Sequence, residues 1–149
     1  NPGQYIDTSA CDGTGTTNAA TCASCSACPN LQYIDPAVCT GNAKVDSGGS
    51  GTSAACTPCG QALTCPTYNF KDASLCTGST LTDGAVCAPC SACSAGEYIN
   101  SAGCPGTLTS DSGGAGTATA CSPCTASGCT AGQYVDASAC TGSGTTNSG

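Results

Sequence analysis

Large hydrophobic side chains are few along this chain, and they occur in short, isolated groups. Four Val, three Ile, five Leu and one Phe are all that 149 residues contain, and no segment has a helical period. Stretches rich in Gly, Ser and Thr separate the groups. The pattern predicts short β-strands joined by turns. The strands are expected near residues 4–7, 32–35, 68–71, 97–100 and 133–136.

Cysteines form a repeating frame. A complete repeat has four cysteines, which we number first to fourth. Ten residues separate the first from the second, ten or sixteen in alternation separate the second from the third, and the third and fourth form Cys-x-x-Cys. The frame predicts a series of small repeats, of which the two terminal ones are partial. Their expected bounds are 1–27, 28–64, 65–92, 93–128 and 129–149.

Three kinds of residue keep the same frame as the cysteines. An aromatic residue stands five places after each first cysteine, and we expect it to cover a disulfide and pack against the adjacent repeat. A glycine stands two places after each second cysteine, where we expect a positive φ. The Asp or Asn of the same frame is expected to cap a turn through its own side chain. The aromatic residues are Tyr33, Phe70, Tyr98 and Tyr134, and Tyr5 fits the frame if a cysteine stands immediately before Asn1. The glycines are Gly13, Gly41, Gly78, Gly106 and Gly142.

The composition predicts that cross-links replace a hydrophobic core. With 17 Cys in 149 residues, the chain has the composition of a disulfide scaffold, and its large apolar residues are too sparse for an ordinary core. A disulfide that closes a loop of about 15 residues stabilises a fold by roughly 3 kcal/mol. Disulfides at this density need an oxidising compartment, so we expect an extracellular or cell-surface location.

The odd number of cysteines follows from the frame. The first repeat lacks its opening cysteine and the last lacks its closing pair. We therefore expect the chain to be part of a longer repeat protein that supplies the missing partners. The alternative is an unpaired, reactive thiol.

Charge and residue types argue against several functions. A net charge of −7 disfavours nucleic acid and anionic membranes as partners, and no run of 18 apolar residues indicates a transmembrane segment. The chain has no His, so a Ser/His/Asp or Cys/His catalytic arrangement is impossible within it. We expect no enzymatic activity, no catalytic residues and no cofactor.

Metal and redox roles compete with structural disulfides as explanations of the cysteines. Cys-x-x-Cys pairs can bind zinc or act as redox centres, but serial and equivalent pairs favour structural disulfides. Calcium at Asp46 and Asp111 is a weaker alternative, because each stands nearly alone in its loop. We expect no metal site. The many Ser and Thr residues suggest O-linked glycans.

The segment CSACSAGEYINSAGC at 90–104, with CSPC at 121–124, resembles the cysteine-rich repeats of tumour necrosis factor receptors and other growth-factor-receptor-like domains. The Thr/Ala/Gly-rich linkers and the lack of Arg are more similar to the surface (immobilisation) antigens of ciliates. The resemblance spans the chain, although the sixteen-residue loops and low charge depart from the ligand-contacting surfaces of the receptors.

The receptor-like resemblance implies an interlaced disulfide pairing. The fourth cysteine of one repeat would pair with the second of the next, and the first with the third of its own repeat. The rival pairing joins first to second and third to fourth, but a Cys-x-x-Cys bond closes a small and often strained ring. Cys11, Cys22 and Cys129 would then have partners outside the chain. The implied pairs are Cys25–Cys39, Cys28–Cys56, Cys59–Cys76, Cys65–Cys87, Cys90–Cys104, Cys93–Cys121 and Cys124–Cys140.

The expected fold is a series of small disulfide-rich repeats with little regular secondary structure, stacked into an elongated rod. The expected function is a non-enzymatic structural protein that associates with itself into a disulfide-stapled surface coat or fibre. A ligand-binding receptor ectodomain is the first alternative, although the chain lacks the Arg anchors common in protein interfaces. A metal-storing thiolate protein is the second.

Overall fold

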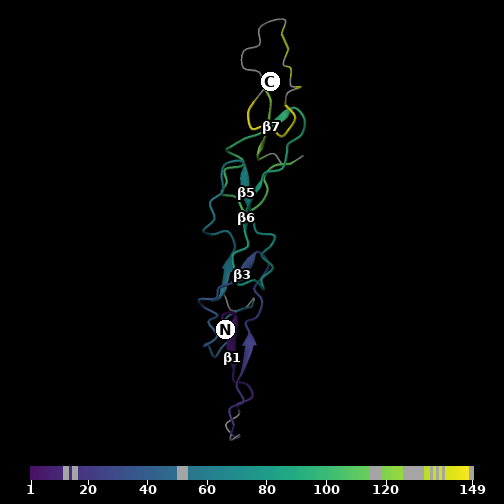
Figure 1. The fold of residues 1–149 in the computed structure, drawn as a ribbon. Helices are drawn as coiled ribbons and strands as arrows, with labels where there is room; N and C mark the ends of the chain where they lie inside the picture. The colour runs from purple at the N-terminus through teal and green to yellow at the C-terminus, as the bar shows by residue number, and fades with distance from the viewer. Residues whose placement is uncertain are drawn as a thin grey trace. The chain divides into compact units, whose positions relative to one another are not determined.

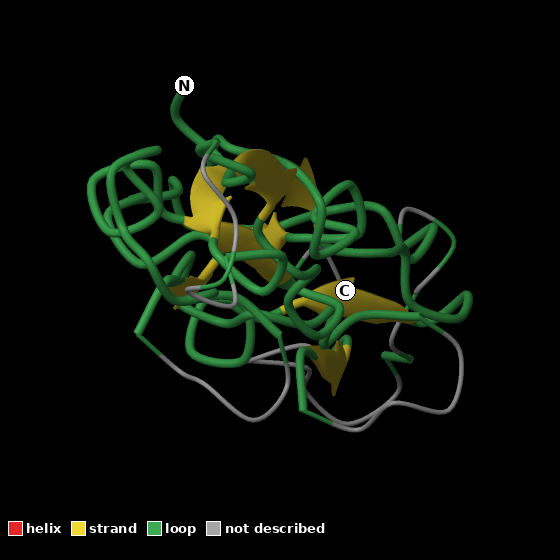
Figure 2. Cartoon of the chain, turned by 90° about the horizontal axis from the view of Figure 1, so that it is seen from below, coloured by secondary structure: helices red, strands yellow, loops and turns green. Residues whose placement is uncertain are grey.

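The computed structural model of the chain describes residues 1–11, 14, 17–49, 54–114, 119–125, 133–134, 136, 138 and 140–147. Over these residues the structure consists of short β-strands and loops, without a helix (Figures 1 and 2). No helix in the described part is therefore long and apolar enough to cross a membrane. The strands are β1 (Gln4–Asp7), β2 (Thr21–Ser24), β3 (Gln32–Ile34), β4 (Cys56–Pro58), β5 (Asn69–Asp72), β6 (Val86–Pro89), β7 (Glu97–Ile99) and β8 (Cys121–Pro123).

The strands form four separate antiparallel pairs, β1–β2, β3–β4, β5–β6 and β7–β8. The first strand of each pair carries the aromatic residue, and these four strands lie where the sequence predicts them. The second strand of each pair carries the third cysteine, which faces the residue after the aromatic, as in Ile34↔Cys56 and Ile99↔Cys121. The described residues of the fifth predicted strand, 133, 134 and 136, are not in a strand.

The second strands were expected to be turns, and that expectation is wrong. CSP lacks the β-branched and aromatic residues that favour strands, and CTP has only Thr57. Three of these four strands contain a third cysteine that is disulfide-bonded to a residue shortly before the first strand, as in Cys28–Cys56. The cross-link holds these three segments beside their partner strands, whereas β2, whose Cys22 is not disulfide-bonded, pairs with β1 without one.

The chain divides into two compact units. Unit 1 comprises Asn1–Gln61 with Ala73–Ala85, and unit 2 comprises Ala62–Asp72 with Val86–Gly149. Each unit contains two strand pairs, and both units take a segment from the predicted repeat 65–92.

The two units correspond through their cysteines. In the first segment of unit 1, Cys25, Cys39 and Cys56 match Cys90, Cys104 and Cys121 of unit 2. In its second segment, Cys76 matches Cys140. Any other residue of a segment is matched by its place relative to these cysteines, so that β1 corresponds to β5 and β3 corresponds to β7.

Sulfur occupies the interior of both units. Among the described residues, the fully buried side chains of largest volume are Cys39, Cys76 and Cys104, all second cysteines, with exposures of 0%, 1% and 0%. The other buried hydrophobic residues are further cysteines, three alanines, Ile34 and Ile99. Leu75 is 65% exposed. Among the described residues, buried cysteines therefore outnumber buried large aliphatic side chains.

Candidate functional site at the repeat junctions

The strongest repeated arrangement is the place where one repeat meets the next, which we call a junction. The first strand of a repeat and the residues just before it lie against the segment that follows the second cysteine of the next repeat. Unit 1 contains two junctions and unit 2 contains two others. In the junction of β3, the amide of Leu31 donates to Cys76 O and that of Ile34 donates to Thr80 O, each at 2.8 Å.

All four junctions share these two hydrogen bonds. The acceptors are the carbonyl of the second cysteine and the carbonyl four residues after it. Because a repeat contacts its neighbour through the same backbone groups each time, the junction is a modular unit. In the other junctions, the amides of Gly3 and Ile6 donate to Cys39 O and Ala43 O, those of Tyr68 and Lys71 donate to Cys104 O and Leu108 O, and those of Gly96 and Ile99 donate to Cys140 O and Gly144 O.

Seven disulfides hold the described residues together, and they are the same seven pairs that the receptor-like resemblance implies. Four of them cross the junctions from a fourth to a second cysteine, with Cα–Cα distances of 6.5–6.6 Å. Three join a first to a third cysteine at 5.5–5.6 Å. The junction disulfides are Cys25–Cys39, Cys59–Cys76, Cys90–Cys104 and Cys124–Cys140. Those within a repeat are Cys28–Cys56, Cys65–Cys87 and Cys93–Cys121.

Three aromatic residues of the frame pack on the junction cysteines. Tyr5 packs against the cluster that contains Cys25 and Cys39, and Tyr33 against the cluster that contains Cys59 and Cys76. Phe70 packs against the corresponding cluster of unit 2, which contains Cys90 and Cys104. Each of the three therefore shields a disulfide that links its own repeat to the next.

The other two aromatic residues of the frame differ in exposure. Tyr98, in β7, is half-buried, whereas Tyr134 is 82% exposed.

The frame glycines lie where the backbones of two repeats touch. The expected positive φ is confirmed for four of them, with values of 84° to 86°. A Cβ on Gly78 would clash with Cys28 O, and one on Gly106 would clash with Cys65 O. Both conformation and close contact therefore require glycine. The four are Gly41, Gly78, Gly106 and Gly142, whereas Gly13 lies outside the described residues.

An acidic or amide side chain closes each junction, a role that the sequence pattern did not predict. The residue seven places after the second cysteine bonds the residue that follows the fourth cysteine of the preceding repeat. Asp46 accepts from Ser26 N at 3.0 Å and from Ser26 Oγ at 2.5 Å. Asp83 accepts from Gly60 N at 2.9 Å. We call this arrangement the side-chain clamp.

Unit 2 has the same clamps. Asp111 accepts from Ser91 N at 3.0 Å and from Ser91 Oγ. Asn147 accepts from Thr125 N at 3.1 Å and donates to Thr125 O at 2.6 Å. The sequence carries a signal for this role, because an Asp or Asn stands seven places after every second cysteine. The residues that stand seven places after a second cysteine are Asn18, Asp46, Asp83, Asp111 and Asn147.

The clamps change the acidity of the carboxyl groups. Partial burial raises the pKa of Asp46, but hydrogen bonds from Ser26 Oγ, Gly48 N and Ser26 N outweigh burial and hold the pKa below its ordinary value of 3.8. Asp111 has a lowered pKa for the same reasons, with Ser91 and Gly113 as donors. Both groups are therefore carboxylates at neutral pH, which strengthens the hydrogen bonds that they accept.

A second carboxylate position caps turns within the repeats. The residue two places after the aromatic accepts a hydrogen bond from the amide two residues further on, for example Asp35 from Ala37 N at 2.8 Å. Asp7 makes the same bond to Ser9 N, and Asp136 to Ser138 N. These backbone bonds, aided by the serine side chains, lower the pKa of Asp7 and Asp136 below 3.8.

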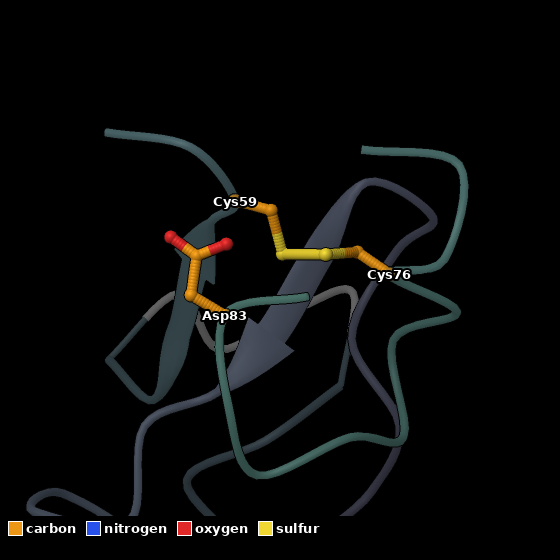
Figure 3. A group of neighbouring side chains, drawn as sticks. All are labelled: Cys59, Cys76 and Asp83. Atoms are coloured by element: carbon orange, nitrogen blue, oxygen red, sulfur yellow. A yellow bond between two sulfur atoms is a disulfide. The ribbon is translucent and has the colours of Figure 1, made fainter. Parts of the chain in front are cut away.

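Two groups of side chains among the described residues have the spacing of a metal site, but their sulfur atoms are already bonded. Cys59, Cys76 and Asp83 bring their ligand atoms within 4.8 Å of one another, yet the two cysteines form a disulfide (Figure 3). The Asp83 carboxylate is engaged by the amides of Gly60 and Ala85. The second group has the same character, because Cys93 and Cys121 are disulfide-bonded. A zinc site needs thiolates, so neither group fits one.

Cys11 and Cys22 form no disulfide, and both are exposed. Cys22 lies in β2 opposite Ile6, the position that paired third cysteines occupy in the other strand pairs. Cys129 lies outside the described residues.

Comparisons with protein-family models, with curated proteins and with solved structures find no significant match for this chain. The structure establishes the general class of this protein and not its family. The chain is a cysteine-rich, disulfide-stabilised protein with short antiparallel strand pairs. Disulfides at this density indicate an extracellular protein.

Proposed function

We propose that this chain is a non-enzymatic, extracellular structural protein whose disulfide-stapled repeats stack into a rod and contribute to a cell-surface coat or a fibre. The observation that carries the proposal is the junction itself. Four junctions use the same disulfide type, the same two backbone hydrogen bonds and the same side-chain clamp. A linear repeat protein can be extended in this way, because each added repeat makes the same contacts with its neighbour.

The arrangement suits mechanical and chemical resistance. Because a disulfide crosses every one of these junctions, unfolding one repeat does not release its neighbour. The surface between junctions is rich in small hydroxyl residues, and Thr107, Thr109 and Ser110 are exposed in one such loop. These loops offer positions for O-linked glycans. The resemblance to ciliate surface antigens supports the same function.

Small-angle X-ray scattering of the oxidised chain tests the rod. A compact globule of this length has a radius of gyration of about 15 Å. We expect a clearly larger value, with a pair-distance distribution that has a long tail. A value near that of the globule would contradict stacking into a rod.

Self-association is tested separately by sedimentation velocity and by negative-stain electron microscopy over a range of concentrations. We expect oligomers or filaments that form as the concentration rises. A chain that stays monomeric and forms no filaments would contradict the coat or fibre, even where scattering supports the rod.

One observation supports the alternative of a ligand-binding ectodomain. Unit 1 has an open hollow of about 500 Å³ near Gly3, a volume within the range of ligand sites.

A further inference from the structure

The hollow of unit 1 combines a buried apolar surface with a polar rim. Its lining includes Ile34 and Cys25, which are 4% and 6% exposed, together with Gln4 and Ser79. Asn1, Pro2, Gly3 and Leu81 also line it. All of these residues belong to unit 1, and they come from β1 and the residues before it, the Cys25 region, β3 and the segment after Cys76.

Unit 2 fills the equivalent place with a tyrosine. Gly3 directly precedes β1 and Tyr68 directly precedes β5, so the two residues match. Tyr68 packs against the buried cluster that contains Cys90 and Ile99, which match Cys25 and Ile34 of the hollow.

The residue that accepts a hydrogen bond from the Tyr68 hydroxyl also has an equivalent in unit 1. Tyr68 Oη donates to Thr145 O at 3.4 Å. Thr145 is the fifth residue after Cys140, and Leu81 is the fifth residue after Cys76. Because Cys140 and Cys76 match, Thr145 and Leu81 match as well.

The two positions have a similar, positive φ. Gly3 has a φ of 79° and Tyr68 a φ of 68°. A Cβ on Gly3 would lie 2.7 Å from Leu81 Cδ2, so Leu81 lies across the path that the Tyr68 side chain takes from its own backbone. Unit 1 thus has a Gly and Leu pair where unit 2 has a Tyr and Thr pair. Because Leu81 does not fill the whole volume, the hollow remains.

We propose that the hollow of unit 1 binds a phenol ring that is not part of unit 1, in the manner in which unit 2 holds its own Tyr68. The ring packs on Ile34 and the Cys25 disulfide, as Tyr68 packs on the cluster of Ile99 and Cys90. The carbonyl of Leu81 corresponds to the acceptor of the Tyr68 hydroxyl. This inference is independent of the proposed structural function.

The phenol can come from two sources with the same chemistry. One is a free small aromatic molecule. The other is a tyrosine of a second copy of this chain, and Tyr134, at 82% exposure, is the most exposed large hydrophobic residue described. The experiment below distinguishes them.

The probe is p-cresol, which is the side chain of tyrosine. Titration of the isotope-labelled, oxidised chain, followed by NMR, is expected to give saturable shifts at Gly3, Ile34 and Leu81, with an affinity in the millimolar range for so small a ligand. Absence of saturable shifts at these residues, or equal shifts spread over both units, would overturn the proposal.

Two variants exchange the arrangement between the units. Gly3→Tyr with Leu81→Thr installs the pair of unit 2 in unit 1, and this variant is expected to lose the p-cresol shifts at Ile34. Tyr68→Gly opens the place in unit 2, and p-cresol is then expected to shift Ile99, which it leaves unmoved in the wild-type chain. Retained binding at Ile34 in the double variant, or no new shift at Ile99 in the single variant, would count against the site.

A matched control removes a phenol without opening a hollow. Tyr134→Ser is expected to leave p-cresol binding at Ile34 unchanged. If the natural source is a second copy, the Ile34 signal of the wild-type chain also moves as its own concentration rises, and Tyr134→Ser abolishes that movement. A signal independent of concentration assigns the site to a free aromatic molecule. Loss of p-cresol binding at Ile34 in Tyr134→Ser would overturn the assignment to the hollow.

Discussion

Asp46 lies twenty residues beyond Ser26 in the sequence, yet its carboxylate accepts hydrogen bonds from both the amide and the hydroxyl of Ser26. Asp111 and Ser91 repeat the relationship in unit 2. The carboxylate bridges two successive repeats beside a junction disulfide. It therefore adds local order where the covalent link alone would leave the Ser26 backbone free to move.

Removal of the clamp should loosen its own junction and no other. In Asp46→Ala the amide of Ser26 loses its acceptor, and we expect it to exchange with solvent up to about tenfold faster, the equivalent of one net hydrogen bond. Exchange at Ser91 is the internal control, since Asp111 still holds it. Asp46→Asn keeps one acceptor oxygen and should have a smaller effect, as the natural Asn147 suggests. Equal exchange at Ser26 in all three proteins would show that the clamp contributes nothing.

Acid should release the clamps of Asp46 and Asp111. Both groups have a pKa below 3.8 in the folded protein, so the folded state favours the carboxylate. Their contribution to stability is complete above pH 3.8 and is lost as the pH falls from there through the lowered pKa. Carbon-detected NMR titration of the side-chain carboxyls checks this, with the reduced, denatured chain as reference. Folded midpoints at or above those of the reference would refute it.

Glycine should be required at position 78 for two reasons that can be tested separately, its positive φ and its close contact with Cys28 O. Gly78→Ala adds a Cβ against Cys28 O in a left-handed conformation, and we expect it to destabilise by about 2–5 kcal/mol. Gly96→Ala is the matched control. Its φ of 87° is equally unfavourable, but nothing lies within 4 Å of the added carbon, so about 1–2 kcal/mol is expected. Chemical denaturation of the oxidised variants gives the loss in free energy of unfolding for each. Similar losses in both variants would show that the contact with Cys28 O adds nothing to the cost of the positive φ.

Leu31 is a position where substitution should raise the stability of the fold. It has a φ of 67°, whereas the matching positions of two other repeats are Gly3 and Gly96. Its side chain is 56% exposed, so little packing is lost on its removal. We expect Leu31→Gly to stabilise by about 0.5–1 kcal/mol, because relief of the left-handed strain exceeds the entropy of the added glycine.

Leu75→Gly is the control for Leu31→Gly. Leu75 is 65% exposed, and Leu31 and Tyr68 are the only described non-glycine residues with a positive φ. Leu75→Gly relieves no left-handed strain and should therefore lower the free energy of unfolding. A loss of stability in both variants, measured by denaturant unfolding, would mean that Leu31 carries no strain.

Thiol labelling should separate the free cysteines from the paired ones. Without reduction, iodoacetamide is expected to modify Cys11 and Cys22, which are exposed and unpaired. Proteolysis of the labelled chain and mass spectrometry should then recover the junction pairs, for example Cys59 linked to Cys76. A peptide in which Cys56 is linked to Cys59 would contradict the structure and support the rival pairing.

The sequence alone determined the frame of this protein. The spacing of the cysteines, the aromatic residue after each first cysteine and the glycine after each second one predicted four of the strands and the positive φ at Gly78. These features are local or periodic, and a chain with so few large apolar residues leaves few other ways to form a fold. The pairing itself came from a resemblance, because spacing alone left the rival connectivity open.

Only the tertiary structure decided how the repeats are joined. The strand at 56–58 has one residue that favours a strand, Thr57, and the Cys28–Cys56 disulfide holds this strand beside β3. The hydrogen bond between Asp46 and Ser26 joins residues twenty apart in the sequence, next to the Cys25–Cys39 disulfide. The hollow beside Gly3 depends on where Leu81 lies in space, which no periodicity of the sequence expresses. Contacts between residues distant in sequence depend on the folded geometry, and the spacing of residue types does not determine that geometry.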